Sequence, residues 1–114
     1  MRVIIAGMRD YYNYEVLKEV IKDAGFDITT ILQGGASGVD NMAVVYGREN
    51  SIPVESHAAN WKIHGKAAGP IRNREMAANA DALIAIWNKK SSGTKNMIEE
   101  AKKRNLLIWV KYVD

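Results

Sequence analysis

Short apolar runs alternate along this chain with segments in which apolar residues recur at helical spacing. The apolar runs have the length of strands and fall at residues 3–6, 28–33, 53–57, 82–87 and 106–110. Helical spacing appears first in Val16, Leu17, Val20, Ile21 and Ala24, and again in the segments 39–46, 70–80 and 94–103. This alternation predicts a parallel sheet that is covered by helices on both faces.

Local signals and connection rules narrow the topology. Asn13 is a suitable N-cap for the first predicted helix, Glu15 lies in its first turn, and Gly25 closes it. Right-handed crossovers favour an α/β, Rossmann-like three-layer sandwich whose five-stranded parallel sheet has the order 3-2-1-4-5. A chain of 114 residues is long enough for one core and too short for two, so we expect a single domain over residues 1–114.

In such a sheet, ligands bind beyond the carboxyl ends of the strands, near the point where the strand order reverses. Four segments are predicted to reach that edge: 7–10, 34–40, 58–74 and 88–94. Every glycine-rich or arginine-bearing segment that stands out in the sequence falls on this edge. Their convergence predicts one binding site there.

The segment from Gly69 to Met76 is predicted to open a helix with an anion site. Pro70 fits the first helical position, where its missing N–H costs nothing. Arg72, Asn73 and Arg74 then follow in the opening turn, where free backbone N–H groups and the helix dipole already favour anions. Cations in that turn weaken a helix, so stability alone does not account for the two arginines. A solvated basic turn is the alternative.

A glycine-rich loop follows the second predicted strand. Gly34, Gly35 and Gly38 permit positive φ angles and close approach of a ligand to the backbone, and Ser37 offers a hydroxyl. The loop is neither a P-loop nor a dinucleotide fingerprint, because it lacks both the Gly-Lys-Ser/Thr and the G-x-G-x-x-G patterns. It is not a nucleophile elbow either, since the final glycine of G-x-S-x-G is missing. A plain tight turn between strand and helix is the alternative.

Composition and charge exclude several classes of protein. No run approaches the ~18–20 apolar residues that span a bilayer, so we expect a soluble protein without membrane contact. The absence of cysteine agrees with a cytoplasmic location. The net charge is only +3, but no acidic residue lies between Glu55 and Glu75, where Lys62, Lys66 and both arginines fall.

These motifs together resemble the SLOG superfamily, a Rossmann-like group that includes DprA/Smf and the LOG cytokinin-activating enzymes. The best match is the YspA-like, cpYpsA-related branch, and the matching runs are 3–10, 34–40, Trp61 with 65–76, and Gly93-Thr94. The resemblance implies binding of a nucleotide or nucleotide-derived ligand, such as an ADP-ribose-like or NAD-like molecule, in bacterial or phage conflict and signalling. No other cofactor is required, and we expect a homo-oligomer, although no residue pattern fixes the number of copies.

The sequence departs from the LOG enzymes at one position. The LOG motif Pro-Gly-Gly-x-Gly-Thr-x-x-Glu supplies a glutamate that assists N-glycosidic cleavage, and Met97 stands at that position here. Glu99 and Glu100 lie two or three residues further on, which on a helix is about 200° to 300° of rotation. General base catalysis needs hydrogen-bond reach, so we interpret the protein as a binder rather than a LOG-type hydrolase, with no catalytic residue assigned.

The expected roles divide the candidate residues into groups. Glycine-loop residues with Gly93 and Thr94 cradle phosphate, the arginines add charged hydrogen bonds, Asp10 or Asp40 reads a sugar, and Trp61 stacks on a base. His57 and His64, seven residues apart, do not have metal-ligand spacing, so no metal is expected. The candidate ligand-binding residues are Gly7, Arg9, Asp10, Gly34, Gly35, Ser37, Gly38, Asp40, Trp61, Arg72, Asn73, Arg74, Gly93 and Thr94.

Two other functions stay open. One is a hydrolase that uses the same site on a nucleotide derivative. The other is binding of single-stranded DNA, which the DprA kinship and the basic edge with Trp61 suggest. Nucleic acid is therefore a possible partner beside the small-molecule ligand.

Overall fold

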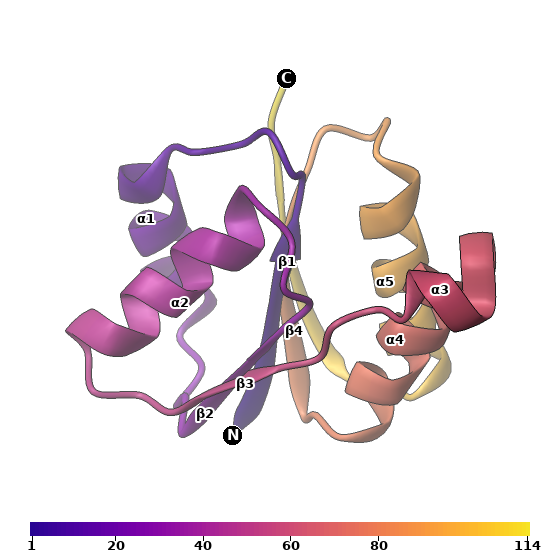
Figure 1. Cartoon of the computed structure of the whole chain (residues 1–114). Coiled ribbons are helices and arrows are strands. Elements are labelled where there is room, and N and C mark those ends of the chain that lie inside the picture. Colours follow the sequence, from indigo (N-terminus) through magenta and orange to yellow (C-terminus); the bar gives the residue numbers. More distant parts are fainter.

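A computed structural model describes residues 1–114 as one parallel sheet between two layers of helices (Figure 1). The strands are β1 (Arg2–Gly7), β2 (Thr30–Gln33), β3 (Val54–Ser56), β4 (Ala82–Trp87) and β5 (Leu107–Tyr112). The helices are α1 (Tyr14–Ala24), α2 (Val39–Glu49), α3 (Trp61–His64), the 3-10 turn η1 (Gly65–Ala67), α4 (Ala68–Ala78) and α5 (Ser92–Lys103). The strand order is β3-β2-β1-β4-β5, which confirms the predicted order and sandwich.

The core lies on both faces of the sheet because side chains alternate along each strand. Val3 and Ile5 of β1 pack with α1 and α2, and Ile4 packs with α4 and α5. In β4 every residue from Ala82 to Ile86 is buried, which explains its uninterrupted apolar run. No helix is both long and apolar enough to cross a bilayer.

The predicted ends of α1 are confirmed. The Asn13 side chain accepts a hydrogen bond of 3.2 Å from the backbone N–H of Val16, and Gly25 closes the helix in the left-handed region at φ 70°. At α5 the same kind of cap is made by Ser91, whose Oγ accepts the N–H of Thr94 at 3.3 Å. These caps fix where the two helices begin, and their buried apolar side chains pack on opposite faces of the sheet.

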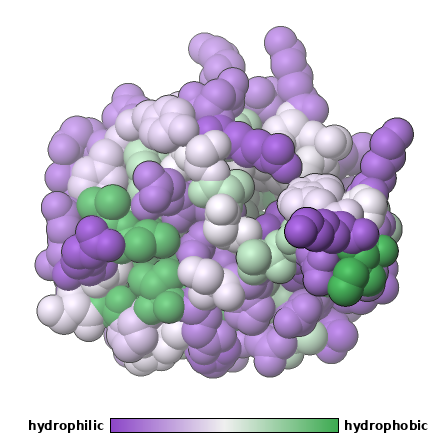
Figure 2. Space-filling view, in the orientation of Figure 1, coloured by the Kyte–Doolittle hydropathy of each residue, from purple (hydrophilic) through white to green (hydrophobic).

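The segment between β3 and α4 differs from the sequence prediction. It contains α3 and η1, which run directly into α4, so α4 begins at Ala68 and Pro70 is its third residue. Helix α3 has four residues and no buried side chain, so it leaves no apolar periodicity in the sequence. Figure 2 shows an apolar patch over α3, where Trp61 and Ile63 are 51% and 72% exposed. The earlier start places Arg72 in the second turn of α4, so the predicted position of the arginines in the opening turn is wrong.

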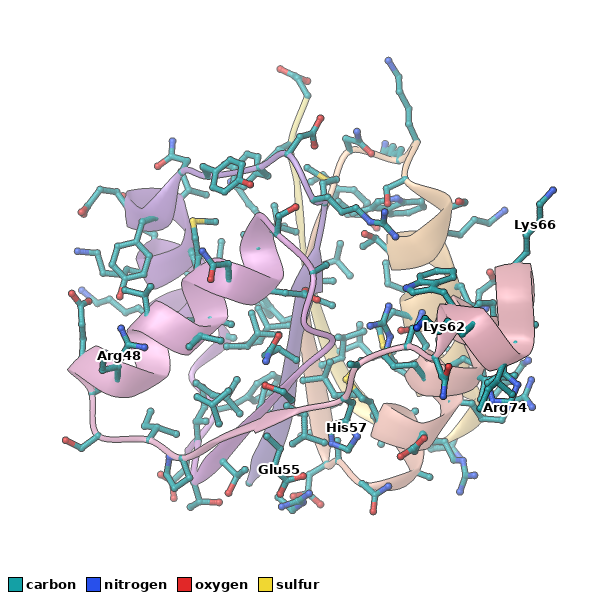
Figure 3. The ribbon with its side chains drawn as sticks, in the orientation of Figure 1. Arg48, Glu55, His57, Lys62, Lys66 and Arg74 are labelled. Atoms are coloured by element: carbon teal, nitrogen blue, oxygen red, sulfur yellow. The ribbon has the colours of Figure 1, made fainter.

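A charged cluster joins β1 to β3 on the face that α4 covers. Arg2 donates two hydrogen bonds to the Glu55 carboxylate, at 2.7 Å and 2.8 Å, and His57 lies 3.3 Å from the same carboxylate. Figure 3 shows Glu55 and His57 side by side. The hydrogen bonds from Arg2 lower the pKa of Glu55 to about 2.

We expect Glu55→Gln to lower the melting temperature at neutral pH, because the amide loses the charged pair with Arg2. A carboxyl group whose folded-state pKa is depressed stabilises the fold above its unfolded pKa of 4.5 and loses that effect as the pH falls toward 2. The difference between wild type and variant should therefore close between these two values, as measured by thermal melts across pH. Glu99→Gln, at an exposed position on α5, is the matched control. A difference that persists at pH 2 would contradict this account of Glu55.

Candidate functional site

An open cleft of about 860 Å³ lies beyond the carboxyl ends of β1 and β4. Its volume falls within the ~300–1,000 Å³ of small-molecule sites. Loops after β1, β2 and β4 line it, together with α3, η1 and the start of α4. The predicted site residues that line it are Gly7, Arg9, Asp10, Asp40, Trp61, Arg72, Asn73, Gly93 and Thr94.

A smaller hollow of about 220 Å³ adjoins this cleft. Its lining includes Gly34, Gly35 and Ser37, none of which lines the cleft itself. Gly38 lines neither space, because it is buried at the start of α2, where an added Cβ would meet the backbone of Met8. The glycine loop and the Gly93-Thr94 turn therefore do not form the single phosphate cradle that the sequence predicts.

The two arginines of α4 have different surroundings. Arg74 is exposed and lies on the outer side of α4 (Figure 3), where its Nε is 3.8 Å from the Glu100 carboxylate of α5. Arg72 is half-buried and lines both the cleft and the hollow. The structure thus brings Arg72 to the predicted site and leaves Arg74 outside it.

Arg72 ties α4 to the glycine loop. Its Nη1 donates to the Gly34 carbonyl at 2.6 Å, and its Nε donates to the Asn73 side chain at 2.9 Å. Burial lowers the pKa of Arg72 and the charge of Asp40 opposes this, so the guanidinium stays protonated at neutral pH. Its other terminal nitrogen, Nη2, makes no hydrogen bond within the protein. Arg72 therefore keeps one charged donor free.

Asp40 organises the same loop from the first turn of α2. Asp40 is only 6% exposed. Its Oδ2 accepts hydrogen bonds from the backbone N–H groups of Gly34 and Ala36, at 3.1 Å and 3.2 Å. Burial raises the pKa of Asp40, while these N–H groups and Arg72 oppose the rise. Oδ1 has no hydrogen-bond partner in the protein, and Asp40 lines the cleft. One acceptor is therefore left for a ligand.

The start of α5 contributes unpaired donors. The backbone N–H groups of Ser92 and Gly93 make no hydrogen bond within the protein, and both residues line the cleft. At a helix N-terminus such groups favour an anion. Thr94 is 3% exposed, and its hydroxyl lies 3.1 Å from Ser91 Oγ, so its side chain mainly shapes this turn.

Asn73 lines the cleft and also positions the turn. It is 4% exposed, and its amide nitrogen donates to the Gly93 carbonyl at 3.3 Å and to Asn96 at 3.0 Å. The Oδ1 atom of Asn73 accepts a hydrogen bond from Nε of Arg72. One buried amide therefore connects the arginine to the N-terminus of α5.

Arg9 and Trp61 stand where the cleft and the hollow meet. The Arg9 guanidinium carbon lies 5.9 Å from the Trp61 ring centroid, within the range of a cation–π contact. Both residues are exposed and line both spaces, and Arg9 makes no ion pair. An exposed indole with a neighbouring guanidinium is a suitable surface for stacking a nucleobase.

Sequence reasoning missed part of the lining. Ser91 could have been found, because a serine three residues before Thr94 at a helix start is an N-cap pattern. The cations Arg9, Lys66, Arg72 and Lys90 outnumber the carboxylates Asp10 and Asp40 among the lining residues, so the cleft favours anions. The lining residues outside the candidate set are Ala6, Met8, Ala36, Lys66, Gly69, Pro70, Met76, Asn88, Lys90, Ser91, Ser92, Asn96 and Met97.

The carboxylates nearest to Met97 in the sequence do not line the cleft. Met97 itself does line it, whereas Glu99 is exposed and Glu100 faces Arg74 and Lys103. No group of three or more histidine, aspartate or glutamate side chains is placed to hold a metal ion. The ionisable side chains that line the cleft are therefore the four cations and the carboxylates of Asp10 and Asp40.

The fold is that of a Rossmann-like α/β domain, with a cleft at the carboxyl edge of its sheet in which cations outnumber carboxylates. A model of the YspA, cpYpsA-related SLOG family matches residues 1–64. The chain is 32% identical over 115 residues to the Gene 61 protein of Mycobacterium phage D29, covering 92% of this chain and 91% of that protein. The chain belongs to the YspA, cpYpsA-related SLOG family.

A solved structure shares the fold. DNA processing protein A (DprA) from Streptococcus pneumoniae superposes with a TM-score of 0.76 at 17% sequence identity, over 96% of this chain. The chain spans about half the length of DprA, 49% of it. The similarity confirms the Rossmann-like arrangement of strands and helices.

Proposed function

We propose that the cleft binds a phosphorylated nucleotide or nucleotide derivative in bacterial or phage signalling or defence. The observation that carries this proposal is the set of unpaired groups in one cleft: two N–H groups of α5, Nη2 of Arg72 and Oδ1 of Asp40. Phosphate requires donors and positive charge, whereas a sugar hydroxyl requires an acceptor. Membership of the SLOG family supports a nucleotide-derived ligand, and the relative from a phage supports a place in phage biology.

Each part of the ligand has a matching group. The phosphate is proposed to bind the N–H groups of Ser92 and Gly93 with Arg72 beside them. The sugar donates a hydroxyl to Asp40 or to Asp10, which is exposed on the same lining. The base stacks on Trp61. Native mass spectrometry of the purified protein, followed by calorimetry with AMP, ADP-ribose and NAD, tests the ligand class.

Gly93→Asp is expected to weaken binding of phosphate-bearing ligands more than 10-fold without loss of stability. An added Cβ at Gly93 meets no atom within 4 Å, so the side chain fits. An acidic residue in the first turn of α5 stabilises the helix by roughly 0.3–1 kcal/mol, and its carboxylate repels a phosphate there. Calorimetry and thermal melts compare Gly93→Asp with Gly93→Asn, whose side chain has nearly the same size and no charge. The comparison separates the effect of the negative charge from the effect of side-chain size. Unchanged affinity in Gly93→Asp would move the phosphate away from α5.

A hydrolase is the alternative use of the same cleft. The carboxylates in its lining are Asp10 and Asp40, and Met97 stands where the LOG glutamate is expected. A general acid or base supplies a factor of ~10²–10⁴ only when it reaches the reacting atom, and Asp40 already holds the glycine loop. Binding without turnover is therefore the better-supported function. Release of free base from AMP, NAD or ADP-ribose, abolished by Asp10→Asn or Asp40→Asn, would assign hydrolysis instead.

Single-stranded nucleic acid is a second candidate partner, and one observation favours it. Trp61, Lys62 and Lys66 are all exposed on α3 and η1, and Figure 3 shows Lys66 pointing out into solvent. An aromatic side chain among cations is suited to stacked bases and backbone phosphates. The salt dependence of binding distinguishes the partners, because a strand that releases several counterions loses affinity steeply with salt.

A further inference from the structure

The hollow beside the cleft contains positive charge, of which the nucleotide phosphate proposed at α5 uses Arg72 and leaves Arg9. Its charged lining residues are Arg9 and Arg72, and no carboxylate lines it. Asp40 lies behind the glycine loop, where its Oδ2 accepts the N–H groups of Gly34 and Ala36. The lining of the hollow therefore has the same net charge as that of the cleft, where four cations accompany two carboxylates, but this charge surrounds a smaller space.

Donors are free at this hollow. Arg9 makes no ion pair, and the Nη2 atom of Arg72 makes no hydrogen bond within the protein. Ser37 uses its hydroxyl to donate to the Arg9 carbonyl, at 2.9 Å, while its backbone N–H makes no hydrogen bond. These groups suit an anion with several oxygen atoms.

The size of the hollow limits what it can hold. Its volume of about 220 Å³ lies below the ~300 Å³ lower end of small-molecule pockets and corresponds to a handful of waters at roughly 30 Å³ each. A phosphoryl group fits this space. The hollow and the cleft share Arg9, Ala36, Trp61 and Arg72, so one ligand can reach both.

We propose that the hollow binds a second phosphoryl group of the same ligand, which makes that ligand a nucleoside with phosphoryl groups on two positions of its sugar. This inference rests on the proposed function and narrows its ligand class. The first phosphoryl group lies at the N-terminus of α5, the base and sugar lie between Trp61 and Asp40, and the second group lies beside Arg9 and the glycine loop. Two phosphoryl groups joined as a pyrophosphate share a bridging oxygen and lie side by side, whereas groups on two positions of a sugar lie on either side of it.

Calorimetry with AMP and with adenosine 3′,5′-bisphosphate tests the second site. The wild-type protein is expected to bind the bisphosphate at least 10-fold more tightly than AMP. Ala58→Glu places a carboxylate in the hollow alone, since Ala58 lines the hollow and does not line the cleft. Ala58 is exposed on a loop and its side chain has no hydrogen bond to lose, so the variant should keep its melting temperature.

The variant is expected to remove the preference for the bisphosphate and to leave the affinity for AMP within about twofold, whereas the uncharged control Ala58→Gln keeps the preference. Equal affinities of the wild type for the two probes would overturn the second site and leave the proposed function standing. A preference that survives in Ala58→Glu would also overturn it, because the second phosphoryl group would then lie elsewhere. The proposed function fails separately, if the wild type binds neither AMP nor the bisphosphate nor any other phosphate-bearing nucleotide.

Discussion

Gly38→Ala is expected to lower the free energy of unfolding by at least about 2 kcal/mol, the largest stability effect that we predict for a single methyl group. Gly38 has φ 70° and ψ −126°, a conformation that residues with a Cβ rarely adopt. The new Cβ would lie 2.3 Å from the Met8 carbonyl oxygen and 2.6 Å from the Arg9 carbonyl carbon. Both atoms belong to the backbone of the loop after β1, so no side-chain rotation relieves the clash.

Gly35→Ala is the matched control in the same loop. Gly35 also has a positive φ, of 78°, but an added Cβ would find its nearest neighbour, the Ala58 Cβ, 3.9 Å away. Only the left-handed backbone then opposes the substitution, at roughly 1–2 kcal/mol. Urea denaturation of both variants measures the difference. Equal losses of stability would show that the close approach of Gly38 to the loop after β1 is not important for the fold.

The fold was predictable because its signals are local and repeated. The runs in β1 and β4 have the length and apolar content of buried parallel strands, and Asn13 and Gly25 mark a helix by backbone chemistry that does not depend on the rest of the molecule. Right-handed crossovers then left few strand orders to consider. The apolar pattern and the rules for connecting strands were sufficient to predict the strands, the longer helices and the strand order.

The candidate site was harder because it depends on where one helix begins. Arg72 and Arg74 are two residues apart, which on a helix is about 200° of rotation, so only one of them can face the cleft. The helical turns at 61–67 set the start of α4 and therefore which arginine faces the cleft. The apolar pattern of the sequence does not reveal these turns. The structural roles of Asp40, Asn73 and Thr94 were also hidden, because burial of a polar side chain depends on partners far away in the sequence.

Arg72→Lys is expected to weaken ligand binding about 10- to 100-fold, whereas Arg74→Lys should change it less than twofold. The Arg72 guanidinium holds the Gly34 carbonyl with Nη1 and leaves Nη2 for a phosphate, and the single nitrogen of lysine cannot do both. Loss of one charged hydrogen bond costs roughly 1.5–3 kcal/mol, which corresponds to this range of affinity.

The comparison is made by calorimetry with whichever of AMP, ADP-ribose and NAD raises the melting temperature of the wild type most. Both variants keep the positive charge of the protein, so a difference between them reports the geometry of the site rather than the overall field. Arg74 makes only its long contact with Glu100, which a lysine can replace. Equal losses in the two variants would mean that binding depends on the charge of α4 as a whole, and the cleft at Arg72 would then not be the site.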